Sequence, residues 1–446
     1  MAHMPSWLIG LVSVTFVLGI MIFVHEWGHF IAAKLAGVRV EVFSLGFGTR
    51  LFGVKRGDTD YRVSALPLGG YVRMAGDNPV EERTGAADEF LSQPRWVRVL
   101  IAVSGPAMNL LLGFAIFWGI FYLKGVPVSK SLHQAPVVAA IPQYKPVSSG
   151  IQPGDRIVSV NGAKTATWEE VYSKLNDLKP GETIELVVSR GGSEIKLTTK
   201  APEKLDGEIS SIVGYISLPA VIEEVGIGTP AERAGLRSGD KFISIDSTPV
   251  KTWPQLVDTV RNSDGRALQV VVERESKQES LSITPIKGID PPTGQQVWQI
   301  GISPQLDDEF HPQSLRASAT VAVGATLTGM KQITDVLGGL FTGRVSVRQL
   351  QGVIGIARES GRAAKQGPMP LSMLMAVISL NLGLLNLLPI PILDGGHVLL
   401  LAIEGLLRRD LSIAVKERFV QVGLVFLLGI FGFVMYSDIL KLVQSH

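Results

Sequence analysis

Hydrophobic residues form four long uncharged runs, and these runs dominate the pattern of the chain. Each lacks Asp, Glu, Lys and Arg for long enough to cross a hydrocarbon core, which takes about 20 residues in a helix. The third run contains Pro389 and Pro391, so its second half is expected to leave helical geometry. The runs are Trp7–Val24, Val99–Leu123, Gln366–Leu393 and Phe419–Ser437.

The composition agrees with a membrane protein. Of 446 residues, 46% are hydrophobic and only 18% are charged, and the mean hydropathy of +0.29 is unusual for a soluble protein. A formal net charge of +2 without a clustered basic face argues against a nucleic-acid partner. The chain has no Cys, so any metal must be held by His and carboxylates.

The N-terminus has two features to separate from the fold. Residues 1–4 look like the remnant of an expression vector, so His3 is not expected to be a ligand. The first hydrophobic run could be a signal peptide, but no basic region precedes it and no small-residue cleavage site follows. We therefore interpret this run as a retained membrane anchor.

Lys and Arg near the ends of the runs predict their orientation. The segments that follow the first and third runs are rich in basic residues, which predicts that both are cytoplasmic. The two chain ends and residues 124–365 then lie on the opposite side, which is the periplasm in a bacterium. The basic residues are Lys34, Arg39, Arg50, Lys55, Arg56 and Arg62 in the first segment and Arg408, Arg409, Lys416 and Arg418 in the second.

The segment between the second and third runs contains an internal repeat. Gly150–Val160 recurs as Gly235–Ile245, at an offset of 85 residues, and in each copy a helical pattern and alternating strands follow. Such a period predicts two small α+β domains rather than a solenoid. The Gly-x-x-x-Gly-Asp pattern resembles PDZ domains, which bind peptides by strand addition. Rigid spacers without a ligand are the alternative.

Hydrophobic residues recur at near-helical spacing from Leu315 to Phe341, among Thr, Lys and Asp. This pattern predicts an amphipathic helix. A position on the membrane surface and packing on the neighbouring domain both agree with the pattern.

The first hydrophobic run continues without a break into His25-Glu26-Trp27-Gly28-His29. Residues four apart on a helix face the same way, so both imidazoles can contact one ion. Glu26 lies about 100° around the helix from His25, a position suited to a general base. This is the zincin signature, and zinc is the expected metal. A helix that carries two His and a Glu without a metal is the alternative, but titratable groups at membrane depth are costly and usually functional.

A third protein ligand is expected, because a catalytic zinc commonly has three protein ligands and a water. Asp394 is the best candidate, since it is the only acidic residue between Glu359 and Glu404 and ends the third run. This carboxylate could instead cap the following helix. His397 is the second candidate for the ligand.

Three motifs, taken in order, resemble the site-2 protease family of intramembrane metalloproteases. The resemblance implies zinc on His25, His29 and Asp394, with Glu26 as the catalytic residue. Two PDZ domains after the second span are typical of one bacterial branch of this family. The motifs are His25–His29, Gly105-Pro106-Ala107-Met108-Asn109 and Leu393-Asp394-Gly395.

The resemblance also implies where the substrate binds. A membrane-dipping β-hairpin is expected between Val38 and Met74, with an edge that could pair with the substrate. Gly105 and Asn109 are interpreted as residues that let helices pack closely. The substrate-binding residues expected from the hairpin and the third span are Gly46, Gly48, Asn386, Pro389 and Pro391.

The predicted function is that of a zinc-dependent endopeptidase cutting transmembrane segments of single-span proteins already trimmed in the periplasm. The resemblance implies an anti-sigma factor and signal peptide remnants as substrates, in envelope-stress signalling at the bacterial inner membrane. The PDZ pair would obstruct untrimmed proteins. One rival is a non-enzymatic membrane adaptor, which predicts no metal. Another is a metal transporter, for which four spans without an inverted repeat offer little pathway.

The predicted fold is therefore a polytopic α-helical membrane protein with four transmembrane helices, a membrane-associated β-hairpin loop and two periplasmic PDZ domains. Both chain ends are expected in the periplasm. The expected segments are the vector remnant (1–4), transmembrane helix 1 (5–36), the β-loop region (37–96), transmembrane helix 2 (97–124), PDZ domain 1 (125–219), PDZ domain 2 (220–308), the amphipathic region (309–367), transmembrane helix 3 (368–407), a cytoplasmic loop (408–417), and transmembrane helix 4 with the C-terminus (418–446).

Overall fold

The computed structural model describes residues 5–78, 84–141, 150–202, 210–226, 228–289, 296–305, 307–342 and 352–444. The expected vector remnant, residues 1–4, lies outside the described residues. The chain forms two compact units. The helical unit comprises Met1–Gly125, Pro312–Gly338 and Ser346–Leu440, and the insert unit is made chiefly of Val126–His311.

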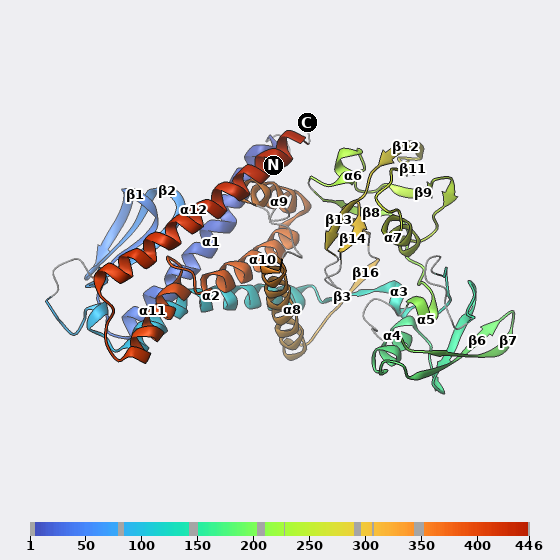
Figure 1. Ribbon diagram of the computed structural model, residues 1–446, viewed down its shortest axis with the longest axis horizontal. Coiled ribbons are helices and arrows are strands. Elements are labelled where there is room, and N and C mark those ends of the chain that lie inside the picture. Colours follow the sequence, from blue (N-terminus) through green and yellow to red (C-terminus); the bar gives the residue numbers. More distant parts are fainter. Residues whose placement is uncertain are drawn as a thin grey trace. The chain divides into compact units, whose positions relative to one another are not determined.

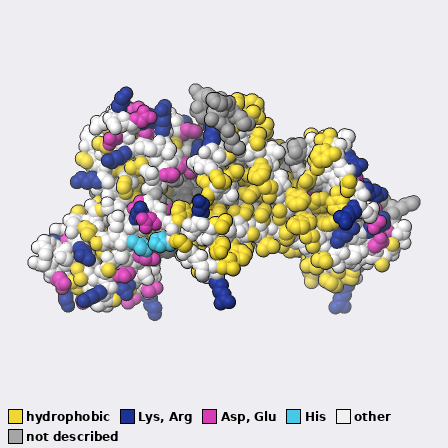
Figure 2. All heavy atoms as spheres, turned by 180° about the vertical axis from the view of Figure 1, so that it is seen from behind, with side chains coloured by type: hydrophobic (Ala, Val, Ile, Leu, Met, Phe, Trp, Pro, Cys, Tyr) yellow, Lys and Arg dark blue, Asp and Glu magenta, His cyan; other side chains and the backbone are white. Residues whose placement is uncertain are grey.

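Among the described residues, four helices of the helical unit are long and apolar enough to cross a membrane, which agrees with the prediction of four spans. Hydrophobic side chains gather in a broad belt over this unit (Figure 2). Phe16, Leu111 and Phe426 are among those that stay exposed, as expected for side chains whose neighbours are lipid tails. The four helices are α1 (Ser6–Leu35), α2 (Arg95–Leu123), α10 (Pro368–Asn386) and α12 (Ile413–Gln444) (Figure 1).

The third hydrophobic run leaves helical geometry, as predicted. Helix α10 ends at Asn386, and a new helix, α11 (Asp394–Leu407), begins only after Pro389 and Pro391. Proline lacks the N–H that would continue the helix. Within the break, Ile392 has a φ of 82°, a conformation rare for a β-branched residue. The break places Asp394 in the first turn of α11.

A curled β-hairpin packs against α1. Its strands, β1 (Val40–Arg56) and β2 (Thr59–Met74), are antiparallel, and repeated irregularities in their register bend the sheet. Gly70 of β2 pairs with Leu45 of β1, and a Cβ added at Gly70 would lie 3.0 Å from Cγ of Glu26. The hairpin therefore brings β2 against the His-Glu motif of α1.

Two further helices support the spans. Helix α8 (Leu315–Phe341) occupies the segment predicted as amphipathic. Trp118 of α2 donates a hydrogen bond to the carbonyl of Leu315 at 3.2 Å, and a Cβ added at Gly329 would lie 3.2 Å from Leu380 of α10. Helix α8 thus contacts α2 and α10, and its position on a membrane surface stays a prediction.

Helix α9 (Val353–Gln366) joins the first and last spans. Its Gly361 packs on Gly10 of α1. The buried carboxylate of Asp438, near the end of α12, accepts hydrogen bonds from the backbone N–H groups of Gly352 and Gly355, both at 3.1 Å. A carboxylate at a helix N-terminus satisfies free donors and matches the helix dipole.

The insert unit contains two four-stranded sheets with the same strand order. The order is β5-β4-β6-β7 in the first sheet and β10-β9-β11-β12 in the second. The elements β4, β5, α4 and β6 begin 85 residues before β9, β10, α7 and β11. The first set is β4 (Arg156–Val160), β5 (Ala163–Lys164), α4 (Trp168–Asn176), β6 (Thr183–Arg190) and β7 (Ser193–Lys200); the second is β9 (Lys241–Ile245), β10 (Thr248–Pro249), α7 (Trp253–Arg261), β11 (Leu268–Arg274) and β12 (Lys277–Ile283).

Each sheet and its helix enclose a separate hydrophobic core, with Trp168 buried in the first and Trp253 in the second. The first and last strands of the insert, β3 (Val126–Ser129) and β16 (Asp308–His311), pair antiparallel, so the insert begins and ends at one place. The remaining short elements are η1 (Phe90–Ser92) of the helical unit and α3 (Lys130–His133), α5 (Ser210–Val213), β8 (Ile222–Val225), α6 (Pro230–Arg233), β13 (Ile286–Ile289), β14 (Gln296–Gln299) and β15 (Ile302–Pro304) of the insert.

Each of these two domains also buries one carboxylate against an arginine of its own sheet. Arg190 donates from Nε and Nη2 to the two oxygens of Asp155, both at 2.7 Å. Arg274 does the same to Asp240, also at 2.7 Å. The hydrogen bonds from Arg190 hold the pKa of the Asp155 carboxyl below its ordinary value. Both carboxylates are therefore fully partnered within their domains.

Candidate metal centre

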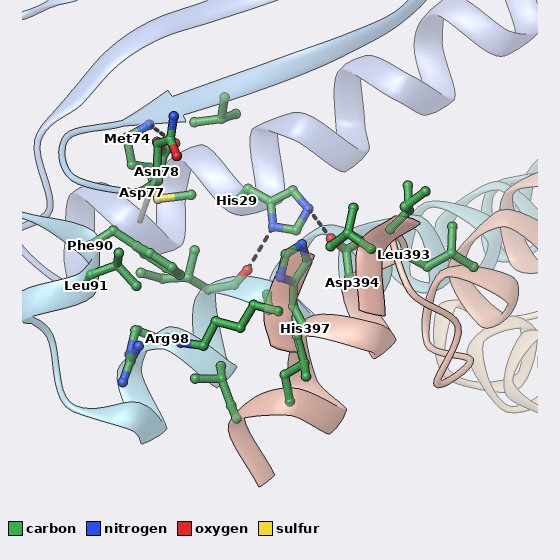
Figure 3. A pocket seen from close by; sticks show the side chains of 18 of the residues that line it. His29, Met74, Asp77, Asn78, Phe90, Leu91, Arg98, Leu393, Asp394 and His397 are labelled. Atoms are coloured by element: carbon green, nitrogen blue, oxygen red, sulfur yellow. Dashed lines mark hydrogen bonds and ion pairs between the residues drawn. The ribbon is translucent and has the colours of Figure 1, made fainter. Parts of the chain in front are cut away.

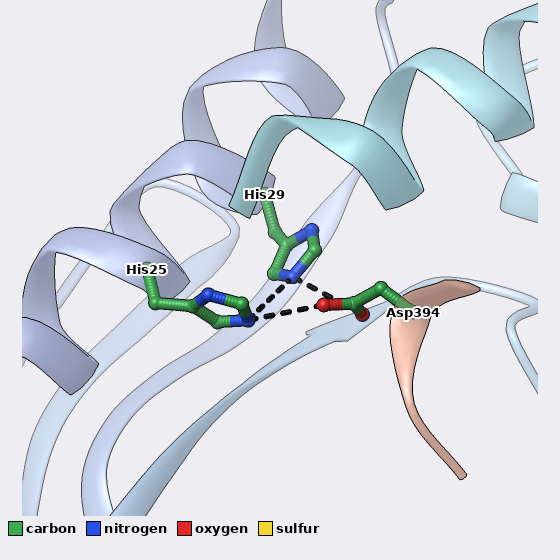
Figure 4. A group of neighbouring side chains, drawn as sticks. All are labelled: His25, His29 and Asp394. Carbon is green, nitrogen blue, oxygen red and sulfur yellow. Dashed lines mark hydrogen bonds and ion pairs between the residues drawn. The ribbon is translucent and has the colours of Figure 1, made fainter. Parts of the chain in front are cut away.

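Three side chains predicted as metal ligands converge inside the helical unit. His25 and His29 project from α1 one turn apart, and Asp394 reaches them from the first turn of α11 (Figure 4). Nε2 of His25 lies 3.1 Å from Oδ2 of Asp394, and Nε2 of His29 lies 3.5 Å from Oδ1. The two Nε2 atoms are 3.3 Å apart. The three potential ligand atoms all lie within 4.8 Å of one another.

The donor set fits zinc. Two imidazole nitrogens and a carboxylate oxygen are ligands that zinc prefers, and three protein ligands leave a position for a reacting group. Nδ1 of His29 is 2.8 Å from the carbonyl oxygen of Ile101, which can only accept, so Nδ1 carries the hydrogen. The lone pair of His29 is then on Nε2, the atom that faces Asp394.

A cavity of about 850 Å³ opens beside this cluster. Glu26 lines it together with both histidines, and Tyr71 and Val72 of β2 form part of its wall. Figure 3 shows His29, His397 and Asp394 on one side of it and Met74, Phe90 and Arg98 on the other. The carboxylate of Glu26 and the three converging side chains therefore border one cavity.

The far part of the same cavity is charged. Glu404 is 1% exposed and lies 2.7 Å from Nζ of Lys416, and both residues line the cavity with Arg98 and Glu417. These residues lie at the ends of spans that the distribution of Lys and Arg predicts to be cytoplasmic. The cavity thus joins the ligand cluster to a polar end of the helical unit.

The predicted substrate-binding residues fall into two groups. Asn386, the last residue of α10, lines the cavity, and its Nδ2 is 3.4 Å from Nε2 of His25. Gly46, Gly48, Pro389 and Pro391 are not among the described residues that line the cavity. The two glycines have φ values of 88° and 84°, which bend β1, and the prolines form the break before α11. A substrate-binding role for these residues stays a prediction.

His397, the second candidate for the ligand, lines the cavity but does not belong to the convergent group of three among the described residues. It projects from α11 one turn beyond Asp394 (Figure 3). Asp394 is therefore the better placed of the two candidates, although the metal role itself stays a prediction.

Helix α2 contacts both histidines, whereas the sequence predicts only that it packs closely. Gly105 does allow close packing, because a Cβ there would lie 2.3 Å from Nε2 of His29. Asn109, however, contacts His25 directly, with Nδ2 3.2 Å from Nδ1. The available signal was the spacing of Ile101, Gly105 and Asn109, which repeats the four-residue interval of the two histidines.

Comparison with known proteins decides the family. The sequence profile of peptidase family M50 matches residues 13–430, nearly the whole chain. The chain belongs to this family, the site-2 proteases. Its relatives include the regulator of sigma-E protease RseP of Escherichia coli K12, 33% identical over 98% of this chain and 100% of the relative. Protease RseP of Yersinia pestis is 32% identical over 98% and 100%.

A Vibrio cholerae relative whose name includes zinc metalloprotease is 32% identical over 95% of this chain and 97% of the relative. Members of family M50 depend on zinc. This M50 protein is accordingly a zinc metalloprotease of the site-2 type and a multi-pass protein of the inner membrane, in agreement with the prediction of enzyme class and cofactor.

Proposed function

We propose that this M50 protease hydrolyses peptide bonds within the transmembrane segments of single-span proteins already trimmed on the periplasmic side. The observation that carries the proposal is the convergence of His25, His29 and Asp394 beside Glu26, in a cavity among helices long enough to span a membrane. A peptide bond cut there lies inside the substrate's own membrane segment.

In this proposal, His25, His29 and Asp394 hold the zinc. When bound, zinc supplies Lewis acidity toward the substrate carbonyl and toward water. Glu26 takes a proton from the attacking water and returns it to the nitrogen of the leaving amine. The oxygen of the water joins the carbonyl carbon, and the bond between that carbon and the amide nitrogen breaks.

The substrate must unwind before it reacts, because a transmembrane helix hides its carbonyl groups in its own hydrogen bonds. Strand β2 runs past Glu26 at Gly70, so an unwound stretch that pairs with this strand would lie next to the base. Asn386 lines the same cavity and offers an amide that can hold the substrate backbone.

We further propose that the two insert domains are PDZ domains in the periplasm, which obstruct substrates that have not been trimmed. Their shared strand order and the repeated Gly-x-x-x-Gly-Asp pattern support the assignment. The Lys and Arg distribution supports a periplasmic insert with both chain ends on the same side. Because the E. coli relative is named a regulator of sigma-E protease, an anti-sigma factor is the proposed substrate, with remnant signal peptides as a second class.

The decisive experiment compares three full-length proteins in detergent: wild type, Glu26→Gln and Asp394→Ala. Zinc content and cleavage of a model transmembrane substrate are measured for each. We expect about one zinc per wild-type chain, an inactive Glu26→Gln that keeps zinc, and an Asp394→Ala that loses zinc affinity. Normal cleavage by Glu26→Gln, or a wild type without zinc, would contradict the proposal.

The proposed obstruction by the insert has its own test. A trimmed substrate and the same substrate with its bulky periplasmic domain are supplied at equal concentration. The trimmed form should be cut faster, and deletion of the insert domains should remove the difference. Equal rates with the intact protease would show that the insert does not select by size.

A further inference from the structure

One face of α2 meets the metal-site histidines at their non-ligating nitrogens. Ile101, Gly105 and Asn109 are spaced four residues apart, so they lie on one face of the helix. The Ile101 carbonyl contacts Nδ1 of His29 at 2.8 Å, and the Asn109 amide contacts Nδ1 of His25 at 3.2 Å. Gly105 between them leaves room for the His29 ring. A single helix therefore contacts Nδ1 of both proposed ligands.

The side chain of Asn109 is incompletely satisfied as it stands. Asn109 is 0% exposed, and its Oδ1 has no hydrogen-bond partner among the described residues. A buried polar atom without a partner is unfavourable, so such an atom calls for an explanation. Its Nδ2 is the atom that faces Nδ1 of His25.

A half-turn of the Asn109 side-chain amide gives Oδ1 a partner, the Nδ1–H of His25, and moves the NH₂ group to the position that Oδ1 leaves. The oxygen and the NH₂ group of an amide have nearly the same shape, so the turned side chain occupies the same space. The turn brings Oδ1 to the position 3.2 Å from Nδ1 of His25 that Nδ2 occupies. A histidine that binds a metal through Nε2 carries its hydrogen on Nδ1 and needs an acceptor there.

We propose that Asn109 is a positioning residue of the metal centre. Its Oδ1 accepts the hydrogen bond from Nδ1–H of His25 and so selects the tautomer whose Nε2 lone pair faces Asp394 and His29. Asn109 does for His25 what the Ile101 carbonyl does for His29. The inference rests on the proposed ligand roles of the two histidines.

Helix α10 packs against the part of α2 that carries Asn109. Ser379 of α10 is fully buried and donates from Oγ to the backbone carbonyl of Asn109 at 2.8 Å. Gly383 of the same helix packs against the carbonyl of Pro106, so α10 braces this part of α2. Ser379 contacts the backbone carbonyl of Asn109 and not its side-chain amide, so Ser379→Ala is a suitable control.

The test measures zinc affinity of the full-length protein in detergent by competition with a chelator. Asn109→Leu and Asn109→Ala remove the acceptor, and we expect each to raise the Kd for zinc by about 10–100-fold. Asn109→Asp keeps an acceptor oxygen and should bind zinc as well as wild type or more tightly. Ser379→Ala should leave the Kd unchanged.

The result that would overturn the inference is an equal loss of zinc affinity in the Asp, Ala and Leu variants, because that pattern indicates a packing role. Wild-type affinity in the Ala and Leu variants would overturn it as well. Asp394→Ala in the same series separates this failure from failure of the ligand set. If Asp394→Ala keeps wild-type affinity, the proposed ligands are wrong, whatever Asn109 does.

Discussion

The ligand cluster of the helical unit and the two domains of the insert unit bury ionisable side chains in opposite ways. In the insert, both oxygens of Asp155 receive hydrogen bonds from Arg190, and Arg274 does the same for Asp240. In the helical unit, three potential ligand atoms lie within 4.8 Å of one another beside a cavity of about 850 Å³. A buried carboxylate whose partners all belong to the protein contributes to the stability of the fold. Potential ligand atoms that converge beside a cavity instead indicate a site for a metal ion.

The largest effect that sharpens this comparison is expected from Gly105→Ala. The new Cβ would lie 2.3 Å from Nε2 of His29 and must displace that nitrogen or the helix. We expect the Kd for zinc to rise at least about tenfold, with a comparable loss of cleavage. Gly119→Ala is the matched control on the same helix, since nothing lies within 4 Å of its added Cβ. Equal effects of the two substitutions would argue against a ligand role for His29.

Arg190→Met tests the insert side of the comparison. It leaves the carboxylate of Asp155, 1% exposed, without its arginine, and should lower the free energy of unfolding of this domain. Hydrogen exchange of the β6 and β7 amides measures the loss. Lys196→Met is the control, because its pair with Glu185 is exposed and contributes little. Zinc affinity should be unchanged, and a loss of zinc would contradict the separation of the two roles.

The same pair predicts a pH dependence. Because Arg190 holds the pKa of Asp155 below its ordinary value of 3.8, the stabilisation is present above that value. This stabilisation is lost as the pH falls through the lowered pKa of the folded protein. Over that range the unfolded chain binds more protons than the folded protein, so protons favour unfolding. The protection factors of the β6 amides, which correct for the intrinsic pH dependence of exchange, should fall below about pH 4 in wild type. In Arg190→Met this acid dependence should be weaker, and an unchanged dependence would point to another carboxyl.

The smallest effect concerns the junction between the two insert domains. The Tyr215 hydroxyl donates a hydrogen bond to the carboxylate of Asp258 on α7. Tyr215→Phe should lower the stability of the insert by about 1 kcal/mol, the typical net value of one hydrogen bond. Thermal unfolding of the full-length protein followed by tryptophan fluorescence measures the change. If Tyr215→Phe lowered the stability of the insert as much as Arg190→Met does, the junction would contribute as much to that stability as the buried ion pair of the first domain.

Several features could be predicted from the chain because they depend on local spacing. The four-residue interval of His25 and His29 places both on one face of any helix, and Pro389 with Pro391 must end a helix wherever they occur. The match between Gly150–Val160 and Gly235–Ile245 needs only the alignment of the chain with itself. Even Asp394 could be selected, because an acidic residue in a long apolar run is rare.

Other features arise from contacts between elements distant in the sequence, and these only the tertiary structure could decide. That Asp394 lies closer to the histidines than His397 does depends on how α11 begins after the break. The position of α2 against α1 determines that Asn109 contacts His25. The position of β2 against α1 determines that Gly70 packs on Glu26. Periodicity determines which face a side chain occupies, but the neighbour of that face is chosen by packing among elements, which no local pattern encodes.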